Sequence, residues 1–272
     1  MAAKLGILAG SGDLPFRVIE ACRAQGRPFF VLALEGAADP LRFEGLPYRS
    51  VRPGAVGEGL RILRENAVEE LVMVGPVRRP TLTQLRPDWH GAKVAARIGL
   101  RALGDDALLS TVIRELESEG FRVIALHDLL HDLLMPMGPL TGLRPDAQAE
   151  ADIAHGIEVA RALGALDVGQ AVVVQEGIVL GVEAVEGTDA LIERAGAVRR
   201  EGLGGVLVKI AKPGQERRVD LPAIGIGTVE GCARAGLRGI ALQAGASLVL
   251  QRQRVAAAAE NAGLFVLGID LS

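Results

Sequence analysis

Short apolar segments alternate with amphipathic helical patterns through the first half of the chain, and this alternation most constrains the fold. The apolar segments lie at residues 4–9, 28–34, 70–75 and 121–126, and segments with helical spacing separate them. Strands that alternate with helices in this way form parallel sheets whose two faces are covered by helices. We therefore predict an α/β fold with a parallel sheet in the N-terminal part.

The second half has a different pattern. Pro and Gly crowd the segment that leads to residue 145, and we place a boundary near residue 140, between domains of residues 1–138 and 139–272. A long helix is predicted over residues 146–166. Hairpins are predicted at Glu176-Gly177 and, within residues 239–250, at Gly245. Hairpins mixed with crossovers predict a second, mixed α/β domain.

Composition limits the class of protein. Apolar residues make up 49% of the 272 residues but aromatic residues only 3%, so the core must consist of Ala, Val, Leu and Ile. The net charge of −3 provides no basic face for a nucleic acid, and we expect no nucleic-acid partner. Cys22 and Cys232 are expected to be small buried side chains in a reducing compartment. No secretion signal or spanning segment is recognised, which indicates a cytoplasmic protein that is free to touch a membrane surface.

A glycine-rich turn follows the first apolar segment. Gly10 and Gly12 occupy the first two glycine places of the dinucleotide-binding pattern, but Pro15 stands in the third. A turn of this kind lets the backbone and a helix N-terminus approach a phosphate, so a nucleotide or nucleotide sugar is favoured over a dinucleotide. Asp13 is placed to cap the following helix. A tight turn without a ligand is the alternative.

Two arginines follow another predicted strand. Gly75 and Pro76 end the segment of residues 70–75, and Arg78 and Arg79 come next. Arginine at the carboxyl end of a strand pairs well with phosphate oxygens. Two solvated arginines would account for the pattern equally well.

Acidic residues gather directly after an apolar run in the second half. Glu183, Glu186 and Asp189 follow residues 171–182, which have the pattern of buried sheet. Helix capping by Thr188 or Asp189 explains only part of this cluster. The other carboxylates of the cluster therefore need a different explanation, such as a bound ligand.

Cations follow on the next predicted strand and its loop. Lys209 and Lys212 lie at a strand end, and Asp220 follows two arginines. If the strands at residues 178–185 and 204–212 are neighbours, carboxylates and cations meet at one sheet edge. Such groups hold a hard divalent cation such as Mg²⁺ and neutralise phosphate charge, which suits phosphoryl or pyrophosphate chemistry. A surface ion-pair network is the competing interpretation.

Several longer motifs resemble one known family over nearly the whole chain. They are "LGILAGSGDLP", "LGDDALLSTVI", "GFRVIALHDLL", "VEAVEGTDALIER", "GGVLVKIAKPGQERRVDLPAIG" and "GLFVLGID". This set resembles the UDP-2,3-diacylglucosamine pyrophosphatases of the LpxI type.

The resemblance implies a cytoplasmic hydrolase of lipid A biosynthesis in Gram-negative bacteria. Such an enzyme cleaves the pyrophosphate of UDP-2,3-diacylglucosamine into UMP and 2,3-diacylglucosamine 1-phosphate (lipid X), and it needs a divalent cation such as Mg²⁺. Water is expected to attack the sugar-side phosphorus. The resemblance also implies a Rossmann-like UDP-binding N-terminal domain and a catalytic, acyl-binding C-terminal domain.

Residue roles follow from the motifs as expectations. Asp220, Asp189 and Thr188 are expected to act in catalysis. Asp220 and Asp189 are also expected to hold the metal, with Glu183 and Glu186 as supporting groups. Lys209, Lys212 and Gln215 are expected to clamp phosphate oxygens. The UDP end is assigned to Gly10, Ser11, Gly12, Asp13, Gly75, Pro76 and Arg78. Expected partners are the substrate and lipid X, with transient contact at the inner membrane surface and a homodimer as a further option.

Three other interpretations stay open. A nicotinamide-dependent reductase acting on a nucleotide sugar is disfavoured by Pro15. A non-catalytic nucleotide-sugar or lipid-binding protein would hold its ligand without turnover. A structural partner protein would use the acidic loop for docking, and Asp220 would then be dispensable for any activity.

Overall fold

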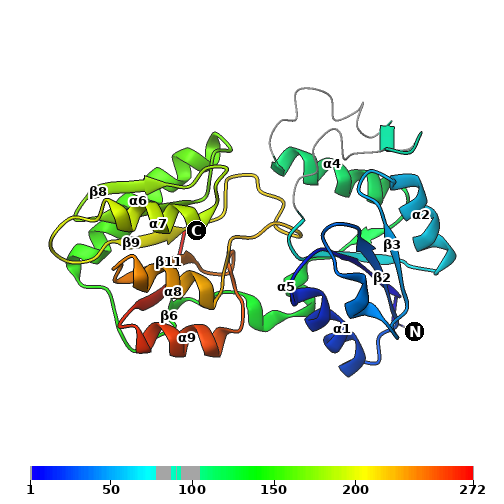
Figure 1. Cartoon of the computed structure of the whole chain (residues 1–272), viewed down its shortest axis with the longest axis horizontal. Coiled ribbons are helices and arrows are strands. Elements are labelled where there is room, and N and C mark those ends of the chain that lie inside the picture. Colours follow the sequence, from blue (N-terminus) through cyan, green and yellow to red (C-terminus); the bar gives the residue numbers. More distant parts are fainter. Residues whose placement is uncertain (1, 78–86, 90, 93–104, 272) are drawn as a thin grey trace. The chain divides into compact units, whose positions relative to one another are not determined.

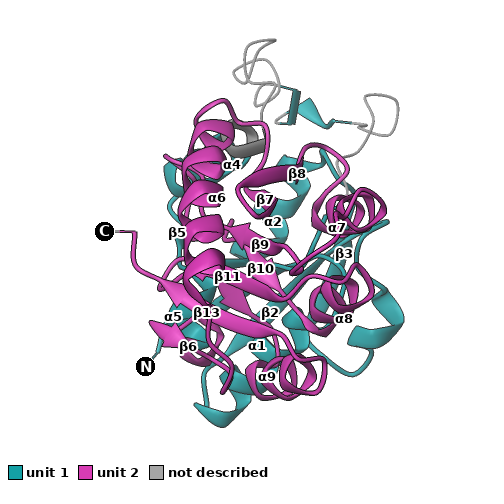
Figure 2. Ribbon diagram, turned by 90° about the vertical axis from the view of Figure 1, so that its left-hand side faces the viewer, with its two compact units in different colours: residues 1–130 teal, residues 131–272 magenta. Residues whose placement is uncertain are grey.

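The computed structural model describes residues 2–77, 87–89, 91–92 and 105–271 (Figure 1). The chain divides into two compact units, Met1–Leu130 and His131–Ser272, coloured separately in Figure 2. This division falls before the predicted boundary near residue 140. One segment with helical spacing, residues 93–103, lies outside the described residues.

Unit 1 is built on a parallel sheet. In its described part the strand order is β3-β2-β1-β4-β5, and every pairing is parallel. The strands are β1 (Leu5–Ala9), β2 (Phe29–Leu34), β3 (Tyr48–Val51), β4 (Glu70–Val74) and β5 (Arg122–Val123). The helices are α1 (Leu14–Ala24), η1 (Pro40–Phe43), α2 (Val56–Glu65), α4 (Asp105–Ser118) and α5 (Leu126–Leu129).

The strand order explains how helices cover the sheet. The chain moves outward from β1 to β3 and then returns past β1 to β4, so right-handed crossovers put α1 on one face and α2 and α4 on the other. Val18 and Ile19 of α1, and Leu60 and Leu63 of α2, are buried. The predicted parallel sheet is therefore confirmed. All strands stay parallel, but the order in which the chain adds them to the sheet reverses between β1 and β4. Ligands of such sheets bind beyond the carboxyl ends of the strands at a reversal of this kind.

Unit 2 is built on a mixed sheet. The strand order is β6-β13-β11-β9-β7-β8, in which β13, β11 and β9 are parallel and the other pairings are antiparallel. The strands are β6 (Gly138–Pro139), β7 (Ala171–Gln175), β8 (Ile178–Val182), β9 (Val206–Lys209), β11 (Gly239–Gln243) and β13 (Phe265–Ile269), with a separate parallel pair of β10 (Ala223–Ile224) and β12 (Leu248–Val249). The helices are η2 (His131–Leu133), α6 (Ala147–Ala165), α7 (Thr188–Ala197), α8 (Ile226–Arg234) and α9 (Arg252–Asn261).

Two apolar clusters sandwich this sheet. One cluster joins the sheet to α7, α8 and α9 through residues such as Leu191, Val229 and Val255, and the other joins it to α6 through Ile153 and Ala160. Figure 2 shows α6 on one side of the sheet and the other three helices on the opposite side. The mixed α/β fold predicted for the second half is confirmed.

The two predicted hairpins have different outcomes. Glu176 and Gly177 both have positive φ (50° and 77°) and join the antiparallel strands β7 and β8, as a two-residue hairpin turn requires. The hairpin predicted at Gly245 is wrong. Both edges of β11 are already paired, with β9 and β13. The chain after Gly245 therefore leaves the sheet, and β12 pairs with β10 instead.

No helix in the described part of the chain combines the length and the apolar character needed to cross a membrane.

Candidate functional site

The loops that follow β1 and β4 are fastened to each other. Gly10 N donates to Val74 O (2.8 Å), and both Ser11 N and Ser11 Oγ donate to Pro76 O at 3.0 Å. A Cβ on Gly10 would lie 2.5 Å from Gly75 O, so only glycine permits this approach. The structure thus brings the predicted UDP-end residues Gly10 and Ser11 together with Gly75 and Pro76. Arg78, predicted with them, lies outside the described residues.

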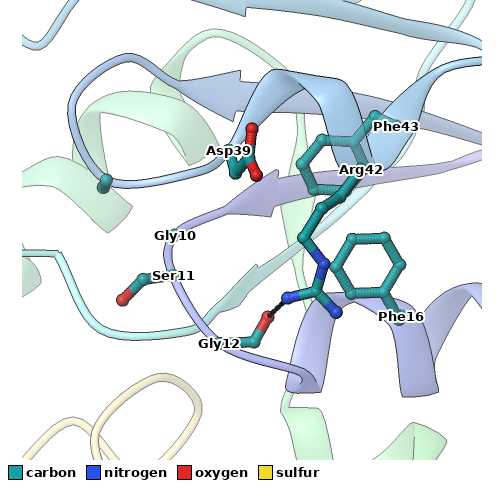
Figure 3. A pocket seen from close by; sticks show the side chains of 8 residues that line it. Gly10, Ser11, Gly12, Phe16, Asp39, Arg42 and Phe43 are labelled. Atoms are coloured by element: carbon teal, nitrogen blue, oxygen red, sulfur yellow. Dashed lines mark hydrogen bonds between the residues drawn. The ribbon is translucent and has the colours of Figure 1, made fainter.

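A cavity of about 110 Å³ opens beside this turn (Figure 3). Arg42 of η1 reaches over the Phe16 ring, 4.1 Å from its centroid, and donates to Gly12 O at 3.3 Å. Phe16 in turn stacks on Phe43 with ring centroids 4.9 Å apart. Arg42 could not be predicted from the sequence, because no local pattern shows that η1 folds back over the glycine turn. The remaining lining residues are Gly10, Ser11, Ala37 and Asp39.

Asp13 has a different role from the predicted one. It occupies the N-cap position of α1, but its side chain makes no capping hydrogen bond. Its carboxylate instead pairs with Arg42 at 2.9 Å. The expected helix cap is therefore wrong, because Asp13 has a helical backbone (φ −98°, ψ −14°) instead of the extended conformation typical of a capping side chain.

The second group of predicted site residues surrounds Lys209 in unit 2. Lys209 is the last residue of β9 and only 6% of it is exposed. Its Nζ donates to Thr188 Oγ1 at 2.8 Å and to Ala223 O at 3.1 Å. A buried ammonium group is thus held by a hydroxyl and a carbonyl at the carboxyl end of a strand.

Thr188 links Lys209 to Glu183. Its hydroxyl accepts from Lys209 and donates to Glu183 Oε1, and the backbone N–H of Gln170 donates to the other oxygen of Glu183 at 3.0 Å. Thr188 therefore does not cap α7, whose N-cap is Gly187 without a side-chain bond. The two strands expected to be neighbours are separated by β7. Glu183 still reaches the site, because its N–H bonds Ala171, the partner of Lys209 in the sheet.

The electrostatics of this cluster centre on Lys209. Burial lowers the pKa of the Lys209 ammonium group, and the carboxylates of Glu183, Asp189 and Asp220 partly oppose this effect. Burial also raises the pKa of the Cys232 thiol to about 12, with Asp189 adding to the effect. One buried cation therefore faces three carboxylates.

Gln215 holds Asp220 in this cluster. Its Nε2 donates to Asp220 Oδ2 at 2.7 Å, and its Oε1 accepts from the backbone N–H of Lys212 at 2.9 Å. Gln215 also contacts Gln170 Oε1 at 3.4 Å, and only 6% of it is exposed. Its amide is engaged within the protein at both ends. The expected clamp on phosphate stays a prediction.

Two other predicted residues are paired outside the cluster. Lys212 Nζ lies 2.7 Å from Asp167, and Glu186 pairs with Arg194. The structure thus brings together Thr188, Lys209, Gln215 and the three carboxylates Glu183, Asp189 and Asp220, and Gln170 joins them. The roles expected of Lys212 and Glu186 stay predictions.

The cluster around Lys209 contains carboxylate oxygens that could hold a divalent cation. Within the described ranges, no three His, Cys, Asp or Glu side chains lie close enough to enclose a metal by themselves. Asp189 is exposed, and no described residue donates to its carboxylate or to Asp220 Oδ1. Mg²⁺ usually binds through one or two carboxylates together with substrate phosphates, so this pair of oxygen donors fits it.

The chain was compared with solved structures and with curated proteins. The UDP-glucose 4-epimerase of Thermus thermophilus in complex with NAD matches with a TM-score of 0.33 and 16% identity, over 98% of this chain and 85% of that chain. The UDP-2,3-diacylglucosamine pyrophosphatase LpxI of Caulobacter vibrioides is 43% identical over 274 residues, which cover 98% of both chains.

Family models agree with this match and with the motif resemblance. The LpxI N-terminal domain matches residues 4–133 and the LpxI C-terminal domain matches residues 136–267. These two matches fall almost entirely within the two compact units. The chain belongs to the LpxI family.

Proposed function

We propose that this chain hydrolyses UDP-2,3-diacylglucosamine to UMP and 2,3-diacylglucosamine 1-phosphate. The curated relative is named as the pyrophosphatase for that substrate and shares 43% identity over 98% of this chain. Both domains of the family are present. The family is therefore that of an enzyme, and the cluster around Lys209 provides the chemical groups that such a reaction needs.

The charge balance around Lys209 is the observation that carries the proposed mechanism. The Lys209 ammonium group interacts electrostatically with three carboxylates, and the formal charges of these four groups sum to −2. This charge favours a divalent cation, and we assign its protein ligand to Asp189, while Asp220 keeps its free oxygen Oδ1 for the attacking water. Glu183 is engaged by Thr188 and Gln170, so it serves to position Thr188. When bound, the cation would screen the phosphate charge and lower the pKa of a water molecule.

The protein groups then have separate tasks. Asp220, oriented by Gln215, uses its other oxygen to hold the attacking water and accept its proton. Lys209 stabilises charge that develops on the phosphoryl oxygens, and Thr188 holds its ammonium group in place. We propose that the water attacks the sugar-side phosphorus, so that UMP is the leaving group.

The cavity in unit 1 suits the nucleotide end of the substrate. The glycine turn presents backbone near the N-terminus of α1, where anions are favoured. Arg42 adds a cation at the same place, although Asp13 shares its charge. We assign UDP recognition to Gly10, Ser11, Gly12, Gly75 and Pro76, with Arg42 as a further contact.

The proposal is tested by turnover of UDP-2,3-diacylglucosamine in ¹⁸O-water, with Mg²⁺ and with a chelator. We expect label in the 1-phosphate of lipid X and turnover that stops with the chelator. Asp220→Asn should lower kcat by about 10²–10⁴-fold. Glu193→Gln, which changes an exposed carboxylate of α7, should not.

Each other result overturns a different part of the proposal. Label in UMP would move the attack to the uridine-side phosphorus. Turnover that survives the chelator would remove the cation from the mechanism. Bound substrate without turnover would favour the binding protein over the enzyme.

The diacylated substrate and product also bear on where the protein works. Because both carry acyl chains, we propose transient contact with the inner membrane surface from the cytoplasm. Co-sedimentation with vesicles, with and without lipid X, tests this contact. A homodimer through the exposed edge of β8 stays a prediction, which sedimentation equilibrium would test.

A further inference from the structure

A second cavity of unit 2 lies away from Lys209. Its volume is about 170 Å³ and it is lined by Leu143, Arg144, Asp146, Arg238, Gly263 and Phe265. Arg238 immediately precedes β11, and Phe265 begins β13. In the sheet Gly239 pairs with Val206, whereas Leu242 pairs with Lys209. The cavity is thus at the amino ends of the parallel strands, about 10 Å along the sheet from the level of Lys209.

Arg238 is fixed at the floor of this cavity. Its backbone N–H donates to Gly205 O at 2.9 Å, and its carbonyl accepts from Phe265 N at 3.2 Å. Its Nη1 donates to Asp146 Oδ2 at 2.9 Å. Nε and Nη2 are buried, yet no acceptor of the described chain reaches either of them. These two N–H groups form the side-on edge of the guanidinium, the geometry that matches two oxygens of one anion.

Asp146 does not supply those oxygens, because it is already engaged. Its Oδ1 accepts from Ala149 N at 2.8 Å and so caps α6. That backbone N–H, and next the hydrogen bond from Arg238, lower the pKa of the Asp146 carboxyl. The carboxylate therefore stays ionised and pairs with Nη1 of Arg238. The side-on edge formed by Nε and Nη2 is left to another acceptor.

Arg144 gives the cavity a net positive charge. It is exposed, and it makes no hydrogen bond or ion pair with any residue that the structure describes. With Arg238 and Asp146 it brings the lining to +1. Leu143 and Phe265 are the apolar members of the lining.

We propose that this cavity binds a small oxyanion, a phosphate or carboxylate group, through the side-on edge of Arg238 and the guanidinium of Arg144. The site is separate from the pyrophosphatase cluster and needs none of its residues. A buried guanidinium edge without an acceptor is costly, so an anion that supplies two oxygens would bind there and stabilise unit 2.

Calorimetric titration of the full chain with inorganic phosphate and with acetate, at constant ionic strength in chloride, tests the site. We expect saturable binding of at least one of the two. Arg144→Gln should weaken it at least tenfold, and so should Arg238→Gln. Because Arg144 is exposed and unpaired among the described residues, its variant should fold normally even if Arg238→Gln does not. Arg234→Gln, an exposed arginine of α8, serves as the matched control and should not change the affinity.

Two further measurements define the source and the independence of the site. If the oxyanion belongs to a lipid headgroup, phosphatidylglycerol vesicles should bind wild type better than Arg144→Gln, and phosphatidylcholine vesicles should not distinguish them. Turnover of UDP-2,3-diacylglucosamine in phosphate-free buffer should be equal in wild type and Arg144→Gln. Loss of the proposed pyrophosphatase activity would leave the binding result intact.

The inference is overturned if phosphate, acetate and vesicles all fail to bind above the chloride background. It is also overturned if binding is undiminished in Arg144→Gln, since the anion would then occupy another place, such as the Lys209 cluster.

Discussion

Gln215 donates from Nε2 to Oδ2 of Asp220 at 2.7 Å, and the other end of its amide is anchored on the backbone of Lys212. This arrangement fixes the carboxylate of Asp220 in one orientation within the Lys209 cluster. We therefore propose that Gln215 positions Asp220. That role separates it from a residue that binds phosphate, because the two make different kinetic predictions.

Gln215→Ala should lower kcat by about 10–100-fold, the usual cost of losing a group that orients a catalytic carboxylate. KM should change little, because the substrate loses no contact. Steady-state kinetics checks this, with Gln253→Ala on the exposed face of α9 as the matched control. A raised KM at unchanged kcat would instead restore the phosphate clamp that the sequence pattern suggests.

Lys209→Met should reveal the effect of burial through the pH dependence of stability. Burial lowers the pKa of Lys209 in the folded chain below its ordinary value of 10.5. At pH values between the lowered pKa of Lys209 in the folded chain and 10.5, the unfolded chain binds more protons than the folded chain. The free energy of unfolding of wild type therefore rises with pH relative to the variant. Above about 10.5 the difference should level off. Urea unfolding of both proteins from about pH 8 upward measures it, and a flat or falling difference contradicts the assignment.

Asp152→Asn should destabilise unit 2 without touching the Lys209 cluster. Asp152 is fully buried in α6, and its carboxylate accepts from Glu176 N at 3.0 Å and Gly177 N at 2.7 Å, holding the β7–β8 turn. The amide loses one acceptor, so we expect a decrease of about 1.5–3 kcal/mol in the free energy of unfolding. Glu158→Gln, an exposed change on the same helix, should stay within about 0.5 kcal/mol. Equal effects of the two changes would show that Asp152 does not hold the turn.

Local sequence patterns predicted where strands and helices form better than they predicted which strands pair with each other. The β7–β8 hairpin was predictable because Glu176-Gly177 sets its own backbone geometry. The hairpin at Gly245 was not, because its strands are paired by β13 and β10, which come from elsewhere in the chain.

The same limit applies to the candidate site. The acidic and basic motifs predicted that Lys209, Thr188 and Asp220 belong to one cluster, and the structure brings them together. Sequence did not show that Gln215 faces inward or that Arg42 crosses the glycine turn. Those contacts depend on how loops fold back, which residue types at fixed spacing do not encode.

Gly10→Ala tests the closeness of the two loops in unit 1. A Cβ there would lie 2.5 Å from Gly75 O and 2.6 Å from Pro76 O, and Pro76 O cannot retreat without losing its two bonds from Ser11. We expect a loss of about 1–3 kcal/mol in stability, the usual cost of overpacking, together with weaker UMP binding.

Gly59→Ala in α2 is the matched control for this change. The nearest side-chain atom to its Cβ would be 3.5 Å away. Alanine is also the better helix former, so the control should gain up to about 1 kcal/mol. Thermal unfolding with and without UMP measures both variants. If Gly10→Ala matched Gly59→Ala in stability and in UMP affinity, the loops after β1 and β4 would not form the rigid floor of a nucleotide site. If only Gly10→Ala lost UMP affinity, that floor and the nucleotide would be linked.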